Sequence, residues 1–564
     1  MVDVDVITQE VIQARLDGIV REMEVAVLRT GFSTIIRESH DFSCGILDQE
    51  GRVIGQYSGL PPHLGAYPDC VKGVLQFYDI EEMEEGDCFL SNHPYYSGVP
   101  HPMDMVVVAP AFYDGEVVAF FASMGHKSDI GGISPGSRNS QARDIYGEGL
   151  HILPVKFLSQ GKRIKETEHF ITANSRTPHL VLGDLSAQAG ALQTMGIQRM
   201  QDLMDTYGKD VVLSAFEQIA SRTADRIRHD VALWPDGVTE MEGSIEDIVN
   251  PGVYIKLHVA VIKEGDKVVL DFSASGDQSA GPINIRPPFA RGIAYHAVLA
   301  VIDPSMPNNY ALADTVECRF RKGSILDPEF PAPVGYYSQT MPGVSTMVYS
   351  AVSQAAGRPI MAYSGQQCST IISHVSDDSP PYVQYELLSP GGPAFDGGDG
   401  WSGAGHGWSG GAKFTSVEIV ESEFDIQIQS FEVVPDSGGA GKFRGGLGYR
   451  RDYLIHGNSK FTGGSARRPS SGVVGGGEGK LGFVFVNPGT SEEQKYDKPV
   501  SGLVVGGGDV LRLEPGGGGG VGSPKERDRE RVIEDLESGF ITAQAAAEIY
   551  GLEAEVIAEV VGAS

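Results

Sequence analysis

Hydrophobic residues near the start of the chain recur at three- and four-residue steps, which is the period of an amphipathic helix. They are Ile12, Leu16, Ile19, Met23 and Val27, and charged residues lie between them, so a helix is predicted over residues 8–29. Two strands joined by a turn at DQEGR are predicted over 37–56, and a short helix over 64–78. Residues 174–234 are mainly helical in pattern.

Between these helical segments lie three apolar runs of strand length, CFLSN, MVVVAPAF and VVAFFASM. Asp114-Gly115 separates the last two runs, and this dipeptide is a strong signal for a two-residue hairpin turn. Further along, the pattern predicts a hairpin over 254–273 and buried helices over 295–302 and 347–357. Strands and helices are therefore mixed through the first two thirds of the chain.

The composition changes near Ser389, after which glycine dominates as far as Gly522. Isoleucine, valine, phenylalanine and tyrosine recur between the glycines, which favours a β-rich region with tight turns over a disordered linker. The last residues predict one or two surface helices. The expected fold class is α+β, with a hairpin-rich region at 1–173, a central helical and mixed region at 174–388, a glycine-rich β region at 389–522 and C-terminal helices at 523–564.

The charge of the chain bears on its partners. The 564 residues include 44 basic and 74 acidic side chains, a net charge of -30, which argues against nucleic acid as a partner because phosphate binding needs a basic face. No apolar run approaches the ~20 residues that span a bilayer, and the N-terminus does not resemble a signal peptide. The five cysteines are scattered, which is typical of reduced thiols. We expect a cytoplasmic protein that acts on a small molecule or with a protein partner.

The predicted hairpin has a geometric consequence for two histidines and a carboxylate. If Asp114-Gly115 is the turn, counting back along both strands places Met103 opposite His126. His101, Asp104 and His126 then gather at one end of the hairpin. These three side chains would lie within reach of a shared cation.

Strict alternation puts His101 and His126 on one face and Asp104 on the other. The constellation therefore requires the strand to end or bulge between His101 and Asp104, and the neighbouring prolines Pro100 and Pro102 favour such a break. Neutral imidazole with carboxylate suits a divalent zinc, manganese or iron ion, and Asp129 is placed to orient an imidazole. From spacing alone, polar hairpin ends that face solvent are favoured over a metal site.

Other motifs are weaker. GGGGGVGSP at 516–524 lacks the Lys-Ser/Thr that ends a phosphate loop, and GGAGKFRGGLG lies in a strand-turn context, so glycine-rich turns are expected in both places. GWSGG, with Ser409 at its centre, matches a nucleophile elbow in letters, but no apolar strand leads into it. His406 is expected in a loop.

Several segments together resemble the hydantoinase B family: RESHDFSCGILDQEGRVIGQ, PPHLGAYPDCVKGVL, NHPYYSGVPHPMD, GHKSDIGGISPGS, EGLHILPVKF, PDSGGAGKFRGGLG and the glycine-rich run with the helices that close the chain. The family contains B-type subunits of ATP-dependent hydantoinases, lactamases and oxoprolinases, and related subunits of acetone and acetophenone carboxylases. The resemblance implies a hetero-oligomer in which a hydantoinase A-type ATPase subunit uses ATP while this chain holds a metal. It places the metal ligands at Asp41, His101, Asp104 and His126.

The chain departs from the family pattern at the same site. His93 stands where the family usually has aspartate, SGVPHPMD is one residue longer than the usual form, and Lys127 replaces a second histidine. His93 is therefore a candidate catalytic base or additional ligand. The leading hypothesis is ATP-dependent hydrolysis of a cyclic amide or imide, such as a hydantoin or lactam. One alternative is carboxylation of a ketone, because the longer SGVPHPMD segment is closer to the carboxylase branch of the family. The other is a structural subunit without catalytic function.

Overall fold

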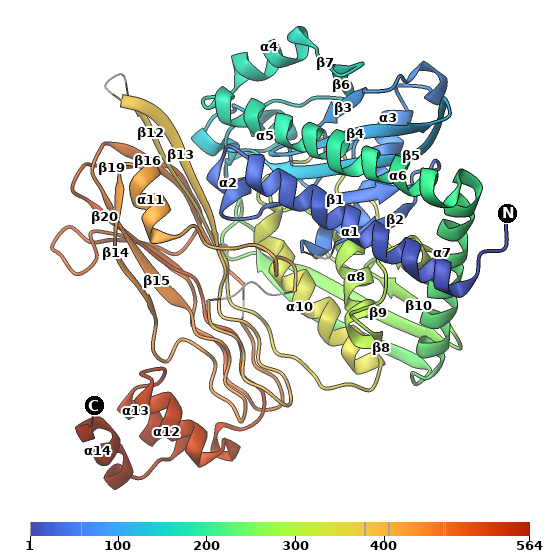
Figure 1. Ribbon diagram of the computed structural model, residues 1–564. Coiled ribbons are helices and arrows are strands. Elements are labelled where there is room, and N and C mark those ends of the chain that lie inside the picture. Colours follow the sequence, from blue (N-terminus) through green and yellow to red (C-terminus); the bar gives the residue numbers. More distant parts are fainter. Residues whose placement is uncertain are drawn as a thin grey trace. The chain divides into compact units, whose positions relative to one another are not determined.

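The computed structural model in Figure 1 describes residues 2–57, 59–376, 379–403, 407–465, 467–468 and 470–563. It divides into two units: unit 1 is Met1–Glu240 with Val259–Tyr337, and unit 2 is Met241–His258 with Ser338–Ser564. Both units contain helices and sheets, so the α+β prediction is confirmed. The four sequence regions at 1–173, 174–388, 389–522 and 523–564 stay a prediction.

Unit 1 is built on a seven-stranded sheet in which every neighbouring pair is antiparallel, in the order β2-β1-β5-β4-β3-β6-β7. Its central strands are buried along most of their length. The strands are β1 (Phe42–Leu47), β2 (Val53–Gln56), β3 (Cys88–Ser91), β4 (Asp104–Tyr113), β5 (Glu116–His126), β6 (Val155–Ser159) and β7 (Lys162–Arg163).

Long helices cover one face of this sheet. Figure 1 shows α1 (Val6–Thr30), α5 (Pro178–Ala191) and α6 (Gln198–Tyr207) lying along it, and a π-helical turn at Leu192–Ile197 joins the last two. The apolar face predicted for the first helix packs into the core with these strands. Asp5 caps α1 by accepting hydrogen bonds from the backbone N–H groups of Ile7 and Thr8, which fixes where the helix begins.

The expected strand pair at 37–56 begins later than predicted. Ser33 caps a one-turn helix, α2 (Thr34–Arg37), and His40 adopts a positive φ of 55°, so β1 starts only at Phe42. The predicted helix at 64–78 is present as a 3-10 turn at Pro61–Gly65 followed by α3 (Tyr67–Leu75). A further helix that the sequence pattern did not predict, α4 (Lys165–Asn174), follows β7.

A smaller sheet, some of whose residues belong to unit 2, follows along the chain. In it β10 (Lys267–Asp271) pairs antiparallel with β9 (Tyr254–Glu264) and parallel with β11 (Val316–Arg319), and β8 (Gly237–Glu246) follows β9 in the order of strands. The hairpin predicted at 254–273 is thereby confirmed. The accompanying helices are α7 (Lys209–Ala232), α8 (Pro287–Ile302) and α9 (Ala311–Thr315).

Unit 2 contains two antiparallel sheets, in the orders β13-β12-β16-β19 and β14-β15-β20-β17-β18, which share one hydrophobic core. Its helices are α10 (Tyr337–Ala355, whose first residue belongs to unit 1), α11 (Val417–Glu423), α12 (Arg529–Glu537), α13 (Ala543–Ala545) and α14 (Ala554–Ala563). The strands are β12 (Cys368–Ser376), β13 (Ser379–Leu388), β14 (Ile426–Val433), β15 (Tyr449–Ile455), β16 (Ser459–Gly464), β17 (Phe483–Val486), β18 (Gln494–Tyr496), β19 (Val500–Val505) and β20 (Val510–Glu514).

The longest glycine runs lie outside these strands, in extended segments that hydrogen-bond sideways to one another. Backbone N–H groups of Gly518 and Gly446 donate to the carbonyl oxygens of Gly446 and Gly392, and the amide of Gly439 donates to Gly518. A Cβ atom at position 518 would collide with the backbone of Gly392, so these segments approach closely only because they carry no side chain. The run at 516–524 therefore has a packing role in the structure.

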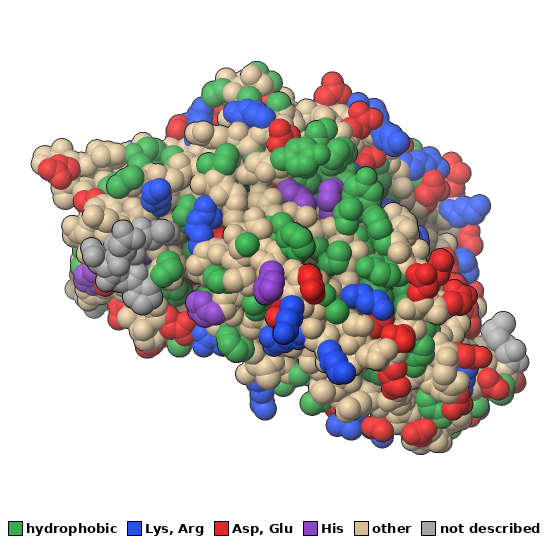
Figure 2. Space-filling model, turned by 90° about the horizontal axis from the view of Figure 1, so that it is seen from above, with side chains coloured by type: hydrophobic (Ala, Val, Ile, Leu, Met, Phe, Trp, Pro, Cys, Tyr) green, Lys and Arg blue, Asp and Glu red, His purple; other side chains and the backbone are tan. Residues whose placement is uncertain are grey.

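Surface charge, helix hydropathy and the cysteines are the remaining features of the structure that the sequence analysis addressed. Figure 2 shows acidic and basic side chains interspersed over one face of the molecule. Among the described helices, none is both long and apolar enough to cross a bilayer. All five cysteines are free thiols, and four of them are buried.

Candidate metal centre

The β4–β5 hairpin brings the candidate ligands together. Asp114 and Gly115 have φ angles of 52° and 80°, the positive values that a type I′ turn requires at both central residues. Tyr113 pairs with Glu116 across this turn, as the sequence predicts. The hairpin and its turn are therefore confirmed.

A β-bulge corrects the predicted pairing beyond the turn. Val118 of β5 is an extra residue without a partner in β4. Every pair beyond it is therefore displaced by one position from the predicted register. Asp104, and not Met103, consequently lies directly opposite His126. Directly paired residues share a face of the sheet, so the bulge places Asp104 on the same face as His126. The regular alternation of side chains between the two faces of the sheet was expected to end between His101 and Asp104. The bulge in β5 is an additional interruption of this alternation.

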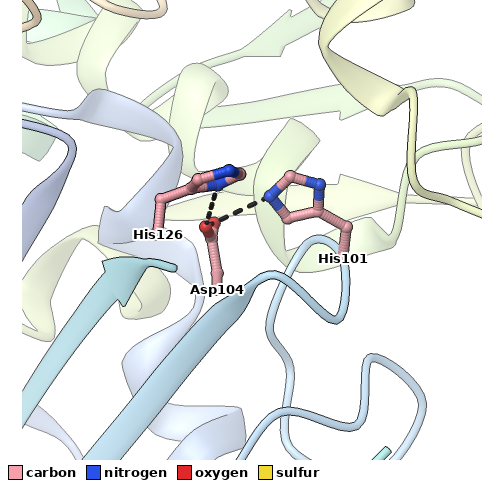
Figure 3. A group of neighbouring side chains, drawn as sticks. All are labelled: His101, Asp104 and His126. Carbon is pink, nitrogen blue, oxygen red and sulfur yellow. Dashed lines mark hydrogen bonds and ion pairs between the residues drawn. The ribbon is translucent and has the colours of Figure 1, made fainter. Parts of the chain in front are cut away.

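His101, Asp104 and His126 form one buried group (Figure 3). The Oδ1 atom of Asp104 lies 3.1 Å from Nε2 of His101 and 2.9 Å from Nδ1 of His126. The centroids of the two imidazole rings lie 5.0 Å apart, and the ring planes are inclined to each other by 44°. The three residues are 2–3% exposed, so solvent-facing hairpin ends are ruled out for these side chains.

Backbone contacts hold the three residues in place. His101 lies in the turn that leads into β4, where its carbonyl accepts the backbone N–H of Asp104 at 3.2 Å. Its ring Nδ1 lies 3.2 Å from the carbonyl oxygen of Gly335, which leaves Nε2 directed toward Asp104. The backbone N–H of His126 donates to the carbonyl of Asp41 at 3.0 Å, so the end of β5 is tied to the start of β1.

The donor set fits a divalent transition-metal ion. Two adjacent ligands with metal bonds of about 2.1 Å lie about 3.0 Å apart when they subtend a right angle. The distances from the Asp104 oxygen to the two imidazole nitrogens, 3.1 and 2.9 Å, match this spacing. One ligand atom from each residue lies within 4.8 Å of the others. Two imidazoles and one carboxylate leave coordination positions open, as catalytic sites do.

The electrostatic state of the group also suits a cation. Burial alone would raise the pKa of Asp104, but the His101 and His126 imidazoles bring it well below its ordinary value. Burial lowers the pKa of His126 to about 4, against the opposing effect of Asp104. An ionised carboxylate and a neutral imidazole are the protonation states in which these side chains bind metals.

Asp41 lies beside this group. Its partly buried carboxyl lies near enough to Asp104 to interact with it electrostatically, and burial together with the Asp104 charge raises the pKa of Asp41 to about 8. Its oxygens do not belong to the cluster of mutually close ligand atoms. The structure thus brings three of the four predicted ligands together and leaves Asp41 adjacent to them.

His93 lies in an aromatic cluster. Its ring centroid is 4.8 Å from that of Tyr96, 5.5 Å from that of His151 and 6.1 Å from that of Phe330. Its Nδ1 accepts the backbone N–H of Tyr95 at 3.3 Å, and burial lowers its pKa to about 4. The catalytic role predicted for His93 rests on a neutral imidazole and stays a prediction.

Asp129 is fully buried and fixes a loop. Its carboxylate accepts backbone N–H groups of Gly131, Gly136 and Arg176, and the Arg176 guanidinium lies 2.9 Å from Oδ2. These contacts organise the chain that follows His126. The role predicted for Asp129 in orienting an imidazole stays a prediction.

Sequence reasoning missed the part played by several buried residues around the group, and it noted Lys127 only as a departure from the family pattern. His63, from the Pro61–Gly65 turn, has its Nδ1 atom 2.7 Å from Ser43 Oγ, and burial lowers its pKa to about 4, with smaller opposing effects from Asp104 and His101. Lys127 is fully buried, donates to the carbonyl of Gly125 and to the side chain of Gln188, and has its pKa lowered by burial to about 8.

Glu148 holds the segment of the chain that contacts His101. Its carboxylate accepts the backbone N–H groups of Val334 and Gly335, and the carbonyl of Gly335 is the group that faces His101. Only the PHLGAYPD and EGLHILP segments, as parts of the family resemblance, pointed toward His63 and Glu148.

The other sequence motifs receive no support as chemical sites. Ser409 is buried in a turn, the described residues 389–403 before it form no strand, and His406 lies outside the described residues. The glycine runs pack against one another as described above. The group of His101, Asp104 and His126 is therefore the candidate site to consider alongside the known relatives.

Comparison with known proteins shows similarity along the whole chain. A family profile described as Hydantoinase B/oxoprolinase matches residues 5–524. The beta chain of the caprolactamase of Pseudomonas jessenii is 30% identical, with 97% of this chain and 96% of that protein covered. The B-type subunit of a putative D-/L-hydantoinase of Pseudomonas sp. (strain NS671) is 27% identical, with 97% and 95% covered.

Solved structures agree with the sequence comparison. The crystal structure of ATP-dependent caprolactamase from Pseudomonas jessenii matches with a TM-score of 0.90 and 27% identity over 98% of both chains. The nucleotide-free structure of an acetone carboxylase matches with a TM-score of 0.85 over 99% of this chain and 82% of that one. Its identity is only 17%, so this second likeness shows a shared fold.

Proposed function

Because the chain belongs to the hydantoinase B/oxoprolinase family, we propose that it is the metal-binding B-type subunit of an ATP-dependent amidohydrolase. The reaction is the opening of a cyclic amide or imide, a hydantoin or lactam, together with an A-type ATPase subunit. Relatives that align along nearly their whole length are named as the B-type or beta component of a hydantoinase and a caprolactamase, which supports this reaction class.

The observation that carries the proposal is the buried carboxylate of Asp104 between two imidazoles, at 3.1 and 2.9 Å. His101, Asp104 and His126 would hold a divalent zinc, manganese or iron ion, with Asp41 as the adjacent fourth candidate. Such an ion polarises a carbonyl oxygen and lowers the pKa of bound water. The Gly335 carbonyl orients His101, and the low pKa of Asp104 keeps it anionic.

Two further residues have proposed roles. His93 is the candidate base or additional ligand, supported by burial that keeps its imidazole neutral at physiological pH. Asp129 is proposed as a positioning residue, since it fixes the loop that leaves β5 directly after His126. The base role of His93 and the positioning role of Asp129 do not need these residues to join the three-ligand group.

The partner would be a hydantoinase A-type subunit that binds ATP. Two findings support this division of labour: relatives are named as subunits, and the glycine runs of this chain are engaged in packing with one another. The assembly would be a hetero-oligomer in the cytoplasm that acts on a small molecule. Nucleic acid is not expected as a partner of a chain with a net charge of -30.

Carboxylation of a ketone is the second candidate, supported by the longer SGVPHPMD form and by the fold shared with acetone carboxylase. A structural subunit without catalysis is the third. The test is ATP turnover by the co-purified complex with hydantoins, lactams or ketones, with and without bicarbonate. We expect turnover with a cyclic amide that needs no bicarbonate. His101→Ala and His126→Ala should abolish it, and the exposed control His229→Ala should not.

The outcomes separate the candidates. Turnover that requires both a ketone and bicarbonate would replace hydrolysis by carboxylation. Full activity in a chain that carries both His101→Ala and His126→Ala would exclude both catalytic functions, and only the structural role would remain.

A further inference from the structure

Three buried side chains of unit 1 form a chain of hydrogen bonds near the candidate metal centre. The hydroxyl oxygen of Tyr67 lies 2.7 Å from Ser43 Oγ, and Ser43 Oγ lies 2.7 Å from Nδ1 of His63. All three side chains are buried, and they come from α3, β1 and the Pro61–Gly65 turn. The hydrogen bonds therefore run through the protein interior and end at the imidazole of His63.

The register of the sheet places these hydrogen bonds on the same face as the metal centre. Ser43 pairs with Met124 of β5, which comes two positions before His126. Directly paired residues share a face, and so do residues two positions apart, so Ser43 projects from the face that carries His126 and Asp104. Two positions correspond to about 7 Å along a strand. Burial is the main influence on the pKa of His63, and the charge of Asp104 is close enough to act on it as well.

The donors and acceptors in this chain of hydrogen bonds have one favourable direction. The backbone N–H of Met124 donates to the hydroxyl oxygen of Tyr67 at 3.3 Å. Within the described part of the protein, the acceptor for the hydroxyl proton of Tyr67 is Ser43 Oγ. Ser43 in turn donates its own proton to Nδ1 of His63. The opposite direction would leave the buried proton of Tyr67 without an acceptor, which costs free energy.

This direction fixes the tautomer of His63. Burial lowers the pKa of His63 to about 4, so at physiological pH the imidazole is neutral and carries one proton. Because Nδ1 accepts from Ser43, this proton is on Nε2. The ring of Phe289, with its centroid 5.7 Å away and its plane inclined by 81°, packs against the imidazole. Nε2 has no acceptor among the described residues, and it is not completely enclosed by protein atoms. His63 therefore holds an N–H donor that is available to a ligand.

We propose that His63 is a catalytic residue whose Nε2–H donates a hydrogen bond to the carbonyl oxygen of the substrate. Addition of a nucleophile to the carbonyl carbon forms a new bond and moves the C=O electron pair onto that oxygen. A donor that is held in place before the reaction stabilises the negative charge that develops there. His63 keeps its proton throughout, and Ser43 is a positioning residue that holds the donor tautomer. The inference rests on the proposed function, because it places the substrate carbonyl beside the metal centre.

The tautomer of His63 can be measured on the full chain without substrate or partner. The chain is labelled with ¹⁵N-histidine, treated with a chelator and recorded by ¹H–¹⁵N NMR, and the signals of His63 are identified by their loss in His63→Asn. We expect a proton on Nε2 and an unprotonated Nδ1. Ser43→Ala removes the donor to Nδ1, so both tautomers should be populated in this variant. Ser221→Ala, at an exposed serine of unit 1, is the matched control and should leave the tautomer unchanged.

Two substitutions of His63 separate the donor at Nε2 from the contact with Ser43. The side chain of asparagine reaches only as far as Nδ1, whereas that of glutamine places an amide N–H close to the position of Nε2. In the co-purified complex, His63→Asn should lower kcat for the cyclic amide at least about 100-fold, while His63→Gln should stay within about tenfold of the parent. The KM, the metal content and the melting temperature should stay close to those of the parent in both variants. A purely structural role would change the melting temperature and would not distinguish the two amides.

Three results would overturn the inference. They are a proton on Nδ1 of His63 in the parent chain, a His63→Asn complex that keeps full kcat, and equal kcat values for His63→Asn and His63→Gln. A single Nε2–H tautomer in Ser43→Ala would overturn the role of Ser43. A parent complex without turnover of cyclic amides would instead refute the proposed function, and the tautomer of His63 would still decide whether a donor is held at Nε2.

Discussion

The carboxyl group of Glu148 makes the stability of unit 1 depend on pH. Glu148 is 1% exposed, and it accepts the backbone N–H groups of Gly335 at 2.6 Å and Val334 at 3.1 Å. Burial nevertheless raises its pKa from the ordinary 4.5 to about 8. The folded protein therefore keeps the Glu148 proton to higher pH than the unfolded chain does. Its contribution to stability is full below pH 4.5 and is lost as the pH rises through about 8.

The size of this effect follows from the two pKa values. Each pH unit between 4.5 and about 8 corresponds to about 1.4 kcal/mol, so ionising Glu148 costs the folded state up to about 5 kcal/mol at high pH. Glu148→Gln has nearly the same shape and stays neutral. Relative to this variant, the wild type should lose stability steadily from pH 5 to pH 8.5.

The assay is thermal unfolding of both proteins in chelator-treated buffer at several pH values, followed by intrinsic fluorescence. The melting temperature of the wild type minus that of Glu148→Gln should fall with increasing pH. Glu82→Gln, at an exposed position in unit 1, serves as the control and should show a much smaller change with pH. A flat difference for Glu148→Gln would refute the raised pKa of Glu148 and the reasoning from its burial.

Three further changes have defined outcomes. Deleting Val118, the unpaired residue, should remove the bulge and leave Asp104 opposite His126, so the purified variant should keep its metal; loss of the ion in metal analysis would show that the bulge itself shapes the site. Asp129→Ala should destabilise unit 1 by about 3 kcal/mol, because it removes the buried acceptor of three backbone N–H groups, each worth about 1 kcal/mol; a loss below about 1 kcal/mol in urea unfolding would contradict this. Gly518→Ala should lower the melting temperature of unit 2, because the added methyl group meets the backbone of a neighbouring segment. An unchanged melting curve would show that the glycine runs tolerate side chains.

The hairpin could be predicted from the sequence because its signals are local. Asp114-Gly115 specifies the turn, and the apolar runs on either side specify the strands. The bulge at Val118 could not be predicted, since an inserted residue in an entirely apolar strand does not interrupt the pattern. Its effect is large, because it decides that Asp104 rather than Met103 faces His126.

The surroundings of the site depend on long-range packing that periodicity does not report. His63 and Glu148 approach the group from segments outside the hairpin, and Gly335 is more distant still along the chain. Likewise, a glycine-rich composition predicts turns but not extended segments that bond to one another sideways. The resemblance to a family supplied the segments but not these contacts.

The central claim is that His101, Asp104 and His126 hold a metal ion, and metal analysis of the purified chain tests it most directly. Inductively coupled plasma mass spectrometry after gel filtration should find close to one zinc, manganese or iron ion per chain. The ion should be absent from His126→Ala and present in the exposed control His229→Ala. A parent chain without stoichiometric metal, or a His126→Ala variant that retains its metal, would contradict the account.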